Sequence, residues 1–345
     1  MKKSLIALAA VAATGAAFAQ SSVTIFGTFD PSIANAKTTY GNGNSVTQNF
    51  VRNNSQGTSQ ISFKGVEDLG GGLKASFMLE NDFDTAKDAT SNFSSKGGEQ
   101  YAGLEGGFGS FKIGAPNTPT LTAQASRQPF STKLGGGFSS SNVATGVGGV
   151  TGVGHVRNNN SVVYATPTFS GFSAAVGYAF KTKADANALP AAATAVGDIT
   201  DIGLNYANGP FRAGLSNYTV GATTPGAIKN VQNNVYAQYD IAGATLYVGF
   251  HDEKAASTGA KSAGSNIAVK YALTPAVNLL ANYGTLNDKS ASNADKKIAA
   301  VGAQYNLSKR SSLYARYVSE KNDNLLTGTL AKEVTTALVG LQHNF

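Results

Sequence analysis

Short segments in which apolar and polar residues alternate recur along almost the whole chain, and this pattern restricts the possible folds most. The clearest example is Ser59–Glu80, with the sequence SQISFKGVEDLGGGLKASFMLE. Ile61 and Phe63 alternate with polar residues in its first half, as Leu73 and Phe77 do in its second. Successive side chains of a strand point to opposite faces, so two strands joined by a glycine-rich turn are predicted. A soluble sandwich and a membrane barrel can both contain such a hairpin.

Sixteen segments of this kind can be counted from Val23 onward. They are predicted near residues 23–30, 57–65, 73–83, 98–105, 110–115, 160–166, 172–180, 199–207, 211–220, 231–240, 244–252, 263–272, 277–286, 296–305, 311–320 and 333–345. Short turns alternate with long polar loops, of which Pro31–Gln56 is the first and Pro116–Asn159 the longest. Short turns at one end and long loops at the other are typical of a transmembrane β-barrel, and bacterial barrels have an even number of strands.

Tyrosines recur at a fixed place before the short turns. Tyr206, Tyr239, Tyr271 and Tyr305 follow one another at intervals of 33, 32 and 34 residues. An amphipathic ring at one strand end fits a membrane–water boundary. Helical repeats have a similar period, but these segments alternate with period two and are rich in Gly, Thr and Asn, so that alternative is rejected. The sandwich alternative is disfavoured, because sixteen strands with short turns at one end and long loops at the other are typical of a closed barrel.

The start of the chain predicts export. Residues 1–19 combine two lysines, an apolar run and Ala17-Phe18-Ala19, which are the three parts of a cleaved secretory signal, so the barrel is expected to occupy residues 20–345. The chain has no cysteine, which excludes disulfides. Without the two signal lysines, 25 basic and 20 acidic residues leave a charge of +5. This dispersed excess does not indicate nucleic-acid binding.

The blocks now described resemble the Gram-negative trimeric porins, most closely the betaproteobacterial and neisserial type. They include SSVTIFGTFD, ISFKGVEDLGGGLKASFMLE, QYAGLEGGFGSFKIG, RNNNSVVYATPTFSGFSAAVGYAF and the final VGLQHNF. The resemblance covers essentially the whole mature chain. It implies a 16-stranded antiparallel barrel in the outer membrane, usually a homotrimer, with a long third loop folded into the lumen. It also implies that the terminal Phe345 belongs to the signal read by the barrel-assembly machinery.

The third loop, Pro116–Asn159, is the insertion long enough to narrow the barrel. The residues themselves leave open whether it folds inward or remains a surface loop. No Asp or Glu occurs between Gly106 and Ala184, whereas several basic residues do. Basic charge that is unpaired in a confined pore raises the local anion concentration, so a mild anion preference is expected.

The resemblance also suggests which residues line the constriction. Arg157 matches an arginine position of the family, whereas Gln60 and Ala115 stand where an arginine is common. Strand parity directs further residues inward, and the loop carries its own basic residues. The predicted lumen set is Arg157, Lys64, Lys112, Arg127, Lys133, Gln60, Ala115, Lys74 and Glu80. Arg127 and Lys133 have the alternative of lying on the outer side of the loop.

Chemistry other than transport has little support. His155, His251 and His343 are scattered without metal-ligand spacing, and the run Gly146–Gly154 lacks the ending of a phosphate-binding loop. No catalytic residues, metal or cofactor are therefore predicted. The expected function is a passive diffusion channel for small hydrophilic solutes and ions. A solute-specific channel and a structural or adhesive barrel with a blocked lumen are the alternatives.

Overall fold

The computed structural model describes residues 22–87, 97–136, 156–180, 198–221, 229–254, 261–289, 295–322 and 331–345. The expected signal peptide, residues 1–19, lies outside these ranges, as do His155 and the run Gly146–Gly154. Among the described residues, no helix is long and apolar enough to cross a membrane.

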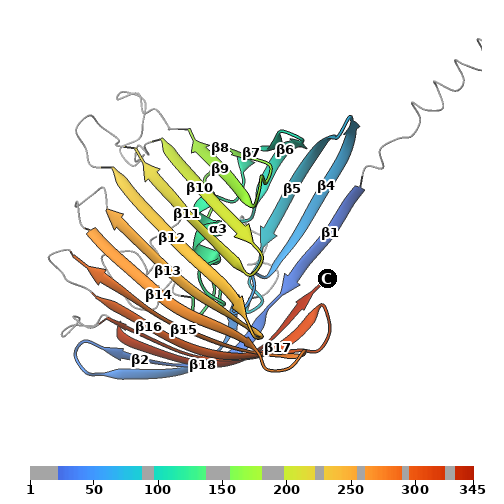
Figure 1. The fold of residues 1–345 in the computed structure, drawn as a ribbon. Coiled ribbons are helices and arrows are strands. Elements are labelled where there is room, and N and C mark those ends of the chain that lie inside the picture. Colours follow the sequence, from blue (N-terminus) through green and yellow to red (C-terminus); the bar gives the residue numbers. More distant parts are fainter. Residues whose placement is uncertain are drawn as a thin grey trace, which may run out of the picture.

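A single antiparallel sheet closes on itself and forms the wall of the molecule, and the short helix α3 lies inside it (Figure 1). The elements are β1 (Ser22–Phe29), β2 (Pro31–Tyr40), β3 (Ser45–Asn53), β4 (Gln60–Gly70), β5 (Leu73–Asp82), β6 (Gln100–Gly106), β7 (Gly109–Ala115), α3 (Pro119–Ala125), β8 (Ser161–Ala165), β9 (Phe172–Ala179), β10 (Ile199–Asn208), β11 (Phe211–Val220), β12 (Asn230–Ile241), β13 (Ala244–Lys254), β14 (Lys261–Ala272), β15 (Val277–Asp288), β16 (Lys296–Asn306), β17 (Ser311–Asn322) and β18 (Ala331–Asn344).

The eighteen strand segments form sixteen transmembrane strands. Only Asp30 separates β1 from β2, and residues 54–59 separate β3 from β4, so each pair is one strand with a break. The barrel closes where β18 pairs with β1 and β2. At this seam the backbones of Gly27 and Phe345 exchange two hydrogen bonds of 3.1 Å. Closure leaves no free sheet edge, which a membrane could not hydrate.

The prediction of a long loop over Pro31–Gln56 is wrong. Most of this range is strand, because β2 and β3 pair with each other and β2 also pairs with β18. The connection between them is a turn at residues 41–44. Polar residues occur on both faces of each segment, so their sequences lack the regular alternation of apolar and polar residues that predicts a strand. Their backbone hydrogen bonds to neighbouring strands, rather than side-chain burial, define them as strands.

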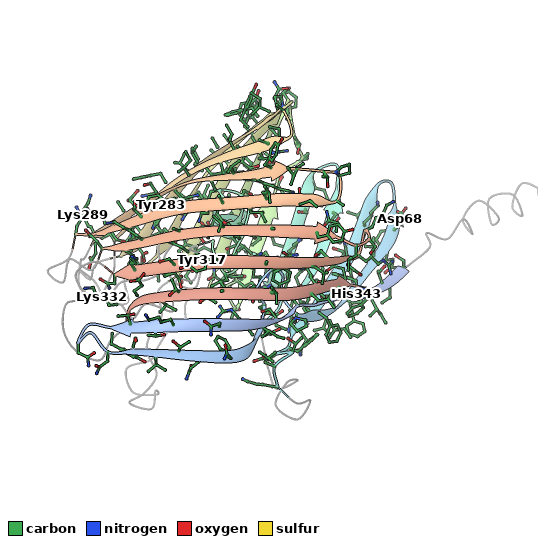
Figure 2. The ribbon with its side chains drawn as sticks, turned by 90° about the horizontal axis from the view of Figure 1, so that it is seen from below. Asp68, Tyr283, Lys289, Tyr317, Lys332 and His343 are labelled. Atoms are coloured by element: carbon green, nitrogen blue, oxygen red, sulfur yellow. The ribbon has the colours of Figure 1, made fainter. Side chains whose placement is uncertain are left out.

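The two ends of the barrel differ as expected. Figure 2 places Lys289 and Lys332 at one rim and Asp68 and His343 at the other. The second rim carries the short turns, such as the one at Gly70, Gly71 and Gly72, whose φ angles are 86°, 59° and 82°. Glycine adopts these positive φ angles without steric cost, and the turn between β4 and β5 requires them.

The alternation of the strands divides the side chains between an outer and an inner face. Val23, Ile25 and Ile267 are more than half exposed on the outside, as are other large apolar side chains around the wall. The girdle tyrosines Tyr239 and Tyr305 are also exposed there. Facing the lumen, Ile298, Val318 and Leu338 pack against residues of the inward loop. The outer face is thus suited to lipid, and the main apolar cluster lies between wall and loop.

Candidate functional site

The described residues 116–136 of the third loop, between β7 and β8, fold into the barrel as expected, and α3 lies along the inner faces of β9–β12 (Figure 1). Thr118 caps α3, because its Oγ1 accepts a hydrogen bond from the Leu121 backbone at 3.2 Å. Asp201 on β10 accepts hydrogen bonds from the backbone N–H and the hydroxyl of Thr120, at 3.0 and 2.6 Å. Gly203 leaves room on the wall for Pro119. A Cβ added to Gly203 would lie 3.0 Å from the Cβ of Pro119.

Wall side chains also hold the loop after α3 through its backbone carbonyls. Asn266 on β14 donates to the Arg127 carbonyl at 2.9 Å, and Asn282 on β15 donates to that of Gly135 at 2.8 Å. Arg316 on β17 donates to the Leu134 carbonyl at 2.6 Å. The loop therefore runs inside the wall from β9 to β17, and it narrows the lumen toward β4–β8.

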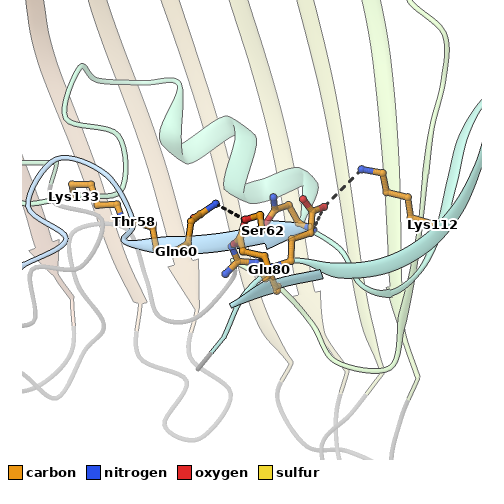
Figure 3. A network of polar contacts seen from close by, with 9 residues as sticks. Thr58, Gln60, Ser62, Glu80, Lys112 and Lys133 are labelled. Atoms are coloured by element: carbon orange, nitrogen blue, oxygen red, sulfur yellow. Dashed lines mark hydrogen bonds and ion pairs between the residues drawn. The ribbon is translucent and has the colours of Figure 1, made fainter. Parts of the chain in front are cut away.

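The opposite side of the narrowed lumen is formed by β4–β8 and carries a polar network (Figure 3). Glu80 on β5 lies at its centre. One carboxylate oxygen accepts from Arg157 at 2.8 Å and from the Glu99 backbone N–H at 3.2 Å, and the other accepts from Gln60 at 2.8 Å. Two of the predicted lumen residues, Arg157 and Gln60, are thus in direct contact with a third, Glu80.

A second ion pair continues this network. Lys112 on β7 lies 3.7 Å from the Glu99 carboxylate, and its ammonium group stands 4.2 Å above the ring of Tyr101. The same carboxylate accepts a hydrogen bond from the Asn117 backbone at 3.1 Å. Glu99 therefore joins the wall to the first residues of the inward loop.

These contacts correct the expectation of unpaired basic charge. Acidic partners are absent between Gly106 and Ala184, but Glu80 and Glu99, which precede that range in the sequence, reach Arg157 and Lys112. In both pairs the cation is more exposed than its partner. The side chains of Arg157 and Glu80 are 23% and 9% exposed, and those of Lys112 and Glu99 are 26% and 11% exposed. The pairs therefore present their positive members to the lumen.

The two basic residues of the loop have different environments. Lys133 donates a hydrogen bond to Thr58, which lies in the break between β3 and β4 (Figure 3). Burial lowers the pKa of Lys133, and the nearby Asp82 and Asp30 partly oppose this effect. Arg127 does not face the open lumen but takes the alternative position on the outer side of the loop, where its side chain is 1% exposed between loop and wall. Burial lowers its pKa to about 10.

The remaining predicted residues lie apart from this network. Lys64 shares the inward face of β4 with Gln60 and Ser62 and is exposed. Lys74 is exposed nearer the short-turn rim, where its cross-strand neighbours are Asp68 and Glu105. Ala115 ends β7 opposite Gln100 and adds no charge to the wall. Phe345 lies at the seam, with its ring 5.9 Å from that of Phe29.

Sequence reasoning missed Glu99, Asp201 and Arg316 as site residues. Each lies in or beside a predicted strand, and inward parity gives a signal for Asp201 and Arg316. The sequence alone could not show which wall positions the loop reaches. His251, which in the sequence is only a scattered histidine, contacts Arg127 inside the barrel. Among the described residues, no group of His, Asp and Glu could hold a metal ion.

Comparison with known proteins agrees with this architecture. The signature of the family described as Gram-negative porin matches residues 5–325. Outer membrane porin protein 32 of Delftia acidovorans is 32% identical, and the match covers all of both chains. Major outer membrane protein P.IB of Neisseria lactamica is 31% identical, again over the full length of both.

Solved structures give the same result. The anion-selective porin from Comamonas acidovorans superimposes with a TM-score of 0.76 at 28% identity, covering 94% of this chain and all of that one. Salmonella typhi OmpF, solved with daunomycin, has a TM-score of 0.68 at 16% identity, covers 94% of this chain and 97% of the other, and supports the fold alone. The chain therefore belongs to the Gram-negative porin family, and it is an outer-membrane porin whose barrel forms a water-filled channel for passive diffusion of small hydrophilic solutes.

Proposed function

We propose that this channel has a mild preference for anions, set where the inward loop faces β4–β8. The residues that carry it are Arg157, Lys112 and Lys64, with Lys133 contributing from the loop. Lys74 adds positive charge nearer the short-turn rim, while Glu80 limits the effect by pairing with Arg157. Gln60 and Ala115, where an arginine is common in the family, make the preference weaker than three arginines would.

One observation carries this proposal, namely the unequal exposure within the two ion pairs. Arg157 and Lys112 are each more than twice as exposed as Glu80 and Glu99. An ion in the lumen therefore meets the positive side chain of each ion pair before the negative one. The low-dielectric wall reduces the screening of the electric field of these cations. The likeness to an anion-selective porin at 28% identity supports the same sign of selectivity.

The test is the reversal potential of the purified channel in a planar bilayer under a salt gradient. An anion-selective potential is expected, and Arg157→Gln should move it toward zero. Glu80→Gln is the matched variant, because it removes the partner charge and should increase anion selectivity. A cation-selective wild type, or shifts of the same sign in both variants, would contradict the proposal.

Other features of the protein follow from its family and are part of the proposal. Cleavage after Ala19 would release a mature chain starting at Gln20, and the mature barrels would assemble as a homotrimer. The terminal Phe345 would be read by the barrel-assembly machinery. Mass spectrometry of the mature protein and crosslinking in outer membranes test the first two. Deletion of Phe345 with measurement of assembled barrel tests the third. No enzymatic activity is proposed.

A further inference from the structure

We infer that Arg127 and His251 form a latch that positions the inward loop, and that the latch holds only while the His251 ring is neutral. The inference concerns how the constriction is kept in place, and it is independent of the sign of ion selectivity. Its two residues come from different elements, the loop after α3 and strand β13.

The contact is enclosed on all sides. Arg127 Nη1 lies 3.3 Å from His251 Nδ1, and the two side chains are 1% and 0% exposed. Gly249, two residues before His251 on the same face of β13, makes room for the arginine. A Cβ there would lie 2.7 Å from Arg127 Cδ. The side-chain amide of Asn266 donates a hydrogen bond of 2.9 Å to the backbone carbonyl of Arg127. The wall is therefore shaped to receive Arg127.

The chemistry of the two groups fixes their roles. A guanidinium group has only donors, so Nδ1 of His251 must accept the hydrogen bond, and the ring must then be neutral with its hydrogen on Nε2. Protonation would place a hydrogen on Nδ1. The hydrogen bond would be lost, and two cations would face each other at the same distance. Away from water, little screening reduces this repulsion.

The surroundings offer no compensating charge among the described residues. In register with His251 are Asn234 on β12 and Gly264 on β14, neither of which is ionisable. Glu253, the next inward residue of β13, interacts with Asn230 and Lys296 instead. Arg127 is the charged group that acts on His251 electrostatically. Uptake of a second proton by the His251 ring is therefore opposed by the positive charge of Arg127. The resulting repulsion would push the loop from the wall.

The position of the latch connects it to conductance. Arg127 lies between α3, which Asp201 holds, and Lys133, which donates to Thr58 in the break between β3 and β4. Repulsion between Arg127 and a protonated His251 would remove the side-chain contact in the middle of this segment and load the hydrogen bond from Asn266 to the Arg127 carbonyl, while the two ends stay attached. We therefore expect acidification to make the loop mobile in the lumen, with lower mean conductance and more frequent closures.

The experiment compares single-channel conductance between about pH 7.5 and about pH 4, each variant normalised to its own value at the higher pH. The wild type should lose about half or more of its conductance, or show a matching increase in closures. His251→Gln provides an acceptor that cannot take up a proton, so its profile should be much flatter. His343→Gln is the matched control, because His343 lies at the rim with Ser311 and should leave the wild-type profile unchanged.

Arg127→Gln keeps the inference testable if His251→Gln does not fold. It removes the fixed cation, so protonation of His251 would no longer repel the loop, and the acid response should disappear. A flat wild-type profile would overturn the inference. So would an acid response that persists in His251→Gln or in Arg127→Gln, because titration of lumen carboxylates would then explain it.

Discussion

Asp201 and Thr120 join the barrel wall to the first turn of α3 through two hydrogen bonds, 2.6 and 3.0 Å long. Both residues are buried, and Ser216 on β11 lies 3.1 Å from the Thr120 hydroxyl. A carboxylate that accepts two hydrogen bonds fixes the direction of the helix as well as its position. This contact determines where the loop begins to cross the lumen.

Replacement of Asp201 should loosen the loop and destabilise the barrel moderately. Hydrogen bonds to a charged group contribute about 1.5–3 kcal/mol each, so Asp201→Ala should lower the free energy of unfolding by a few kcal/mol at most. Open-channel current noise should rise. Urea unfolding in lipid vesicles and single-channel recording measure the two effects. Thr200→Ala, which alters the neighbouring outward position, is the control. Equal effects in both variants would show that Asp201 has no special role.

An arginine at position 60 should strengthen anion selectivity. Gln60 already donates to Glu80 at 2.8 Å, so the longer guanidinium of Gln60→Arg can reach the same carboxylate and add a positive charge. The reversal potential should become more anion-selective, and the shift should shrink in high salt as screening increases. Gln60→Met, which keeps about the same side-chain size but has neither a charge nor a hydrogen bond to Glu80, separates the effect of the added charge from that of losing Gln60. An unchanged potential in Gln60→Arg would place this residue outside the ion path.

Gly249→Ala should displace the loop without preventing barrel formation. The added methyl group would lie 2.5 Å from Asn266 Oδ1 and 2.9 Å from Arg127 Cβ, so the loop must shift. Overpacking of this kind costs about 1–3 kcal/mol. Gly177→Ala is the matched control, because its new methyl group would meet its nearest neighbour at 3.5 Å. Conductance should change in the first variant alone. The same conductance in both would mean that the loop does not depend on this close approach.

Gly27→Ala should weaken the seam of the barrel. A Cβ at this position would lie 2.4 Å from Phe345 Cζ and 2.3 Å from the Gln60 carbonyl oxygen. The terminal ring and the strand pairing at closure would both have to move. The variant should unfold at lower urea concentration and lose the heat-dependent gel shift of a folded barrel more easily. Gly43→Ala serves as a comparison, because no atom lies within 4 Å of its new methyl group, although its φ of 86° adds strain. A Gly27→Ala barrel as stable as Gly43→Ala would contradict this prediction.

Much of the wall could be predicted from the sequence, because alternation is a local property. A strand such as β14 shows its outer face in Ile267, Val269 and Tyr271, and the structure places the same residues outside. The hairpin β4–β5 was predicted from its alternation and its glycines. β2 and β3 were missed for the converse reason. They lack an apolar face, and only pairing with β18 and with each other makes them strands.

The class of fold, the direction of most side chains and the resemblance to porins could all be read from the amino-acid sequence. Which charges meet depends on the folded barrel. Arg157 and Glu80 are 77 residues apart in the chain, and Arg127 and His251 are 124 apart. Strand parity can direct each of these groups inward. The pairing depends on where the third loop crosses the lumen, which the hydrogen bonds of Asp201, Asn266, Asn282 and Arg316 fix only once the barrel has closed.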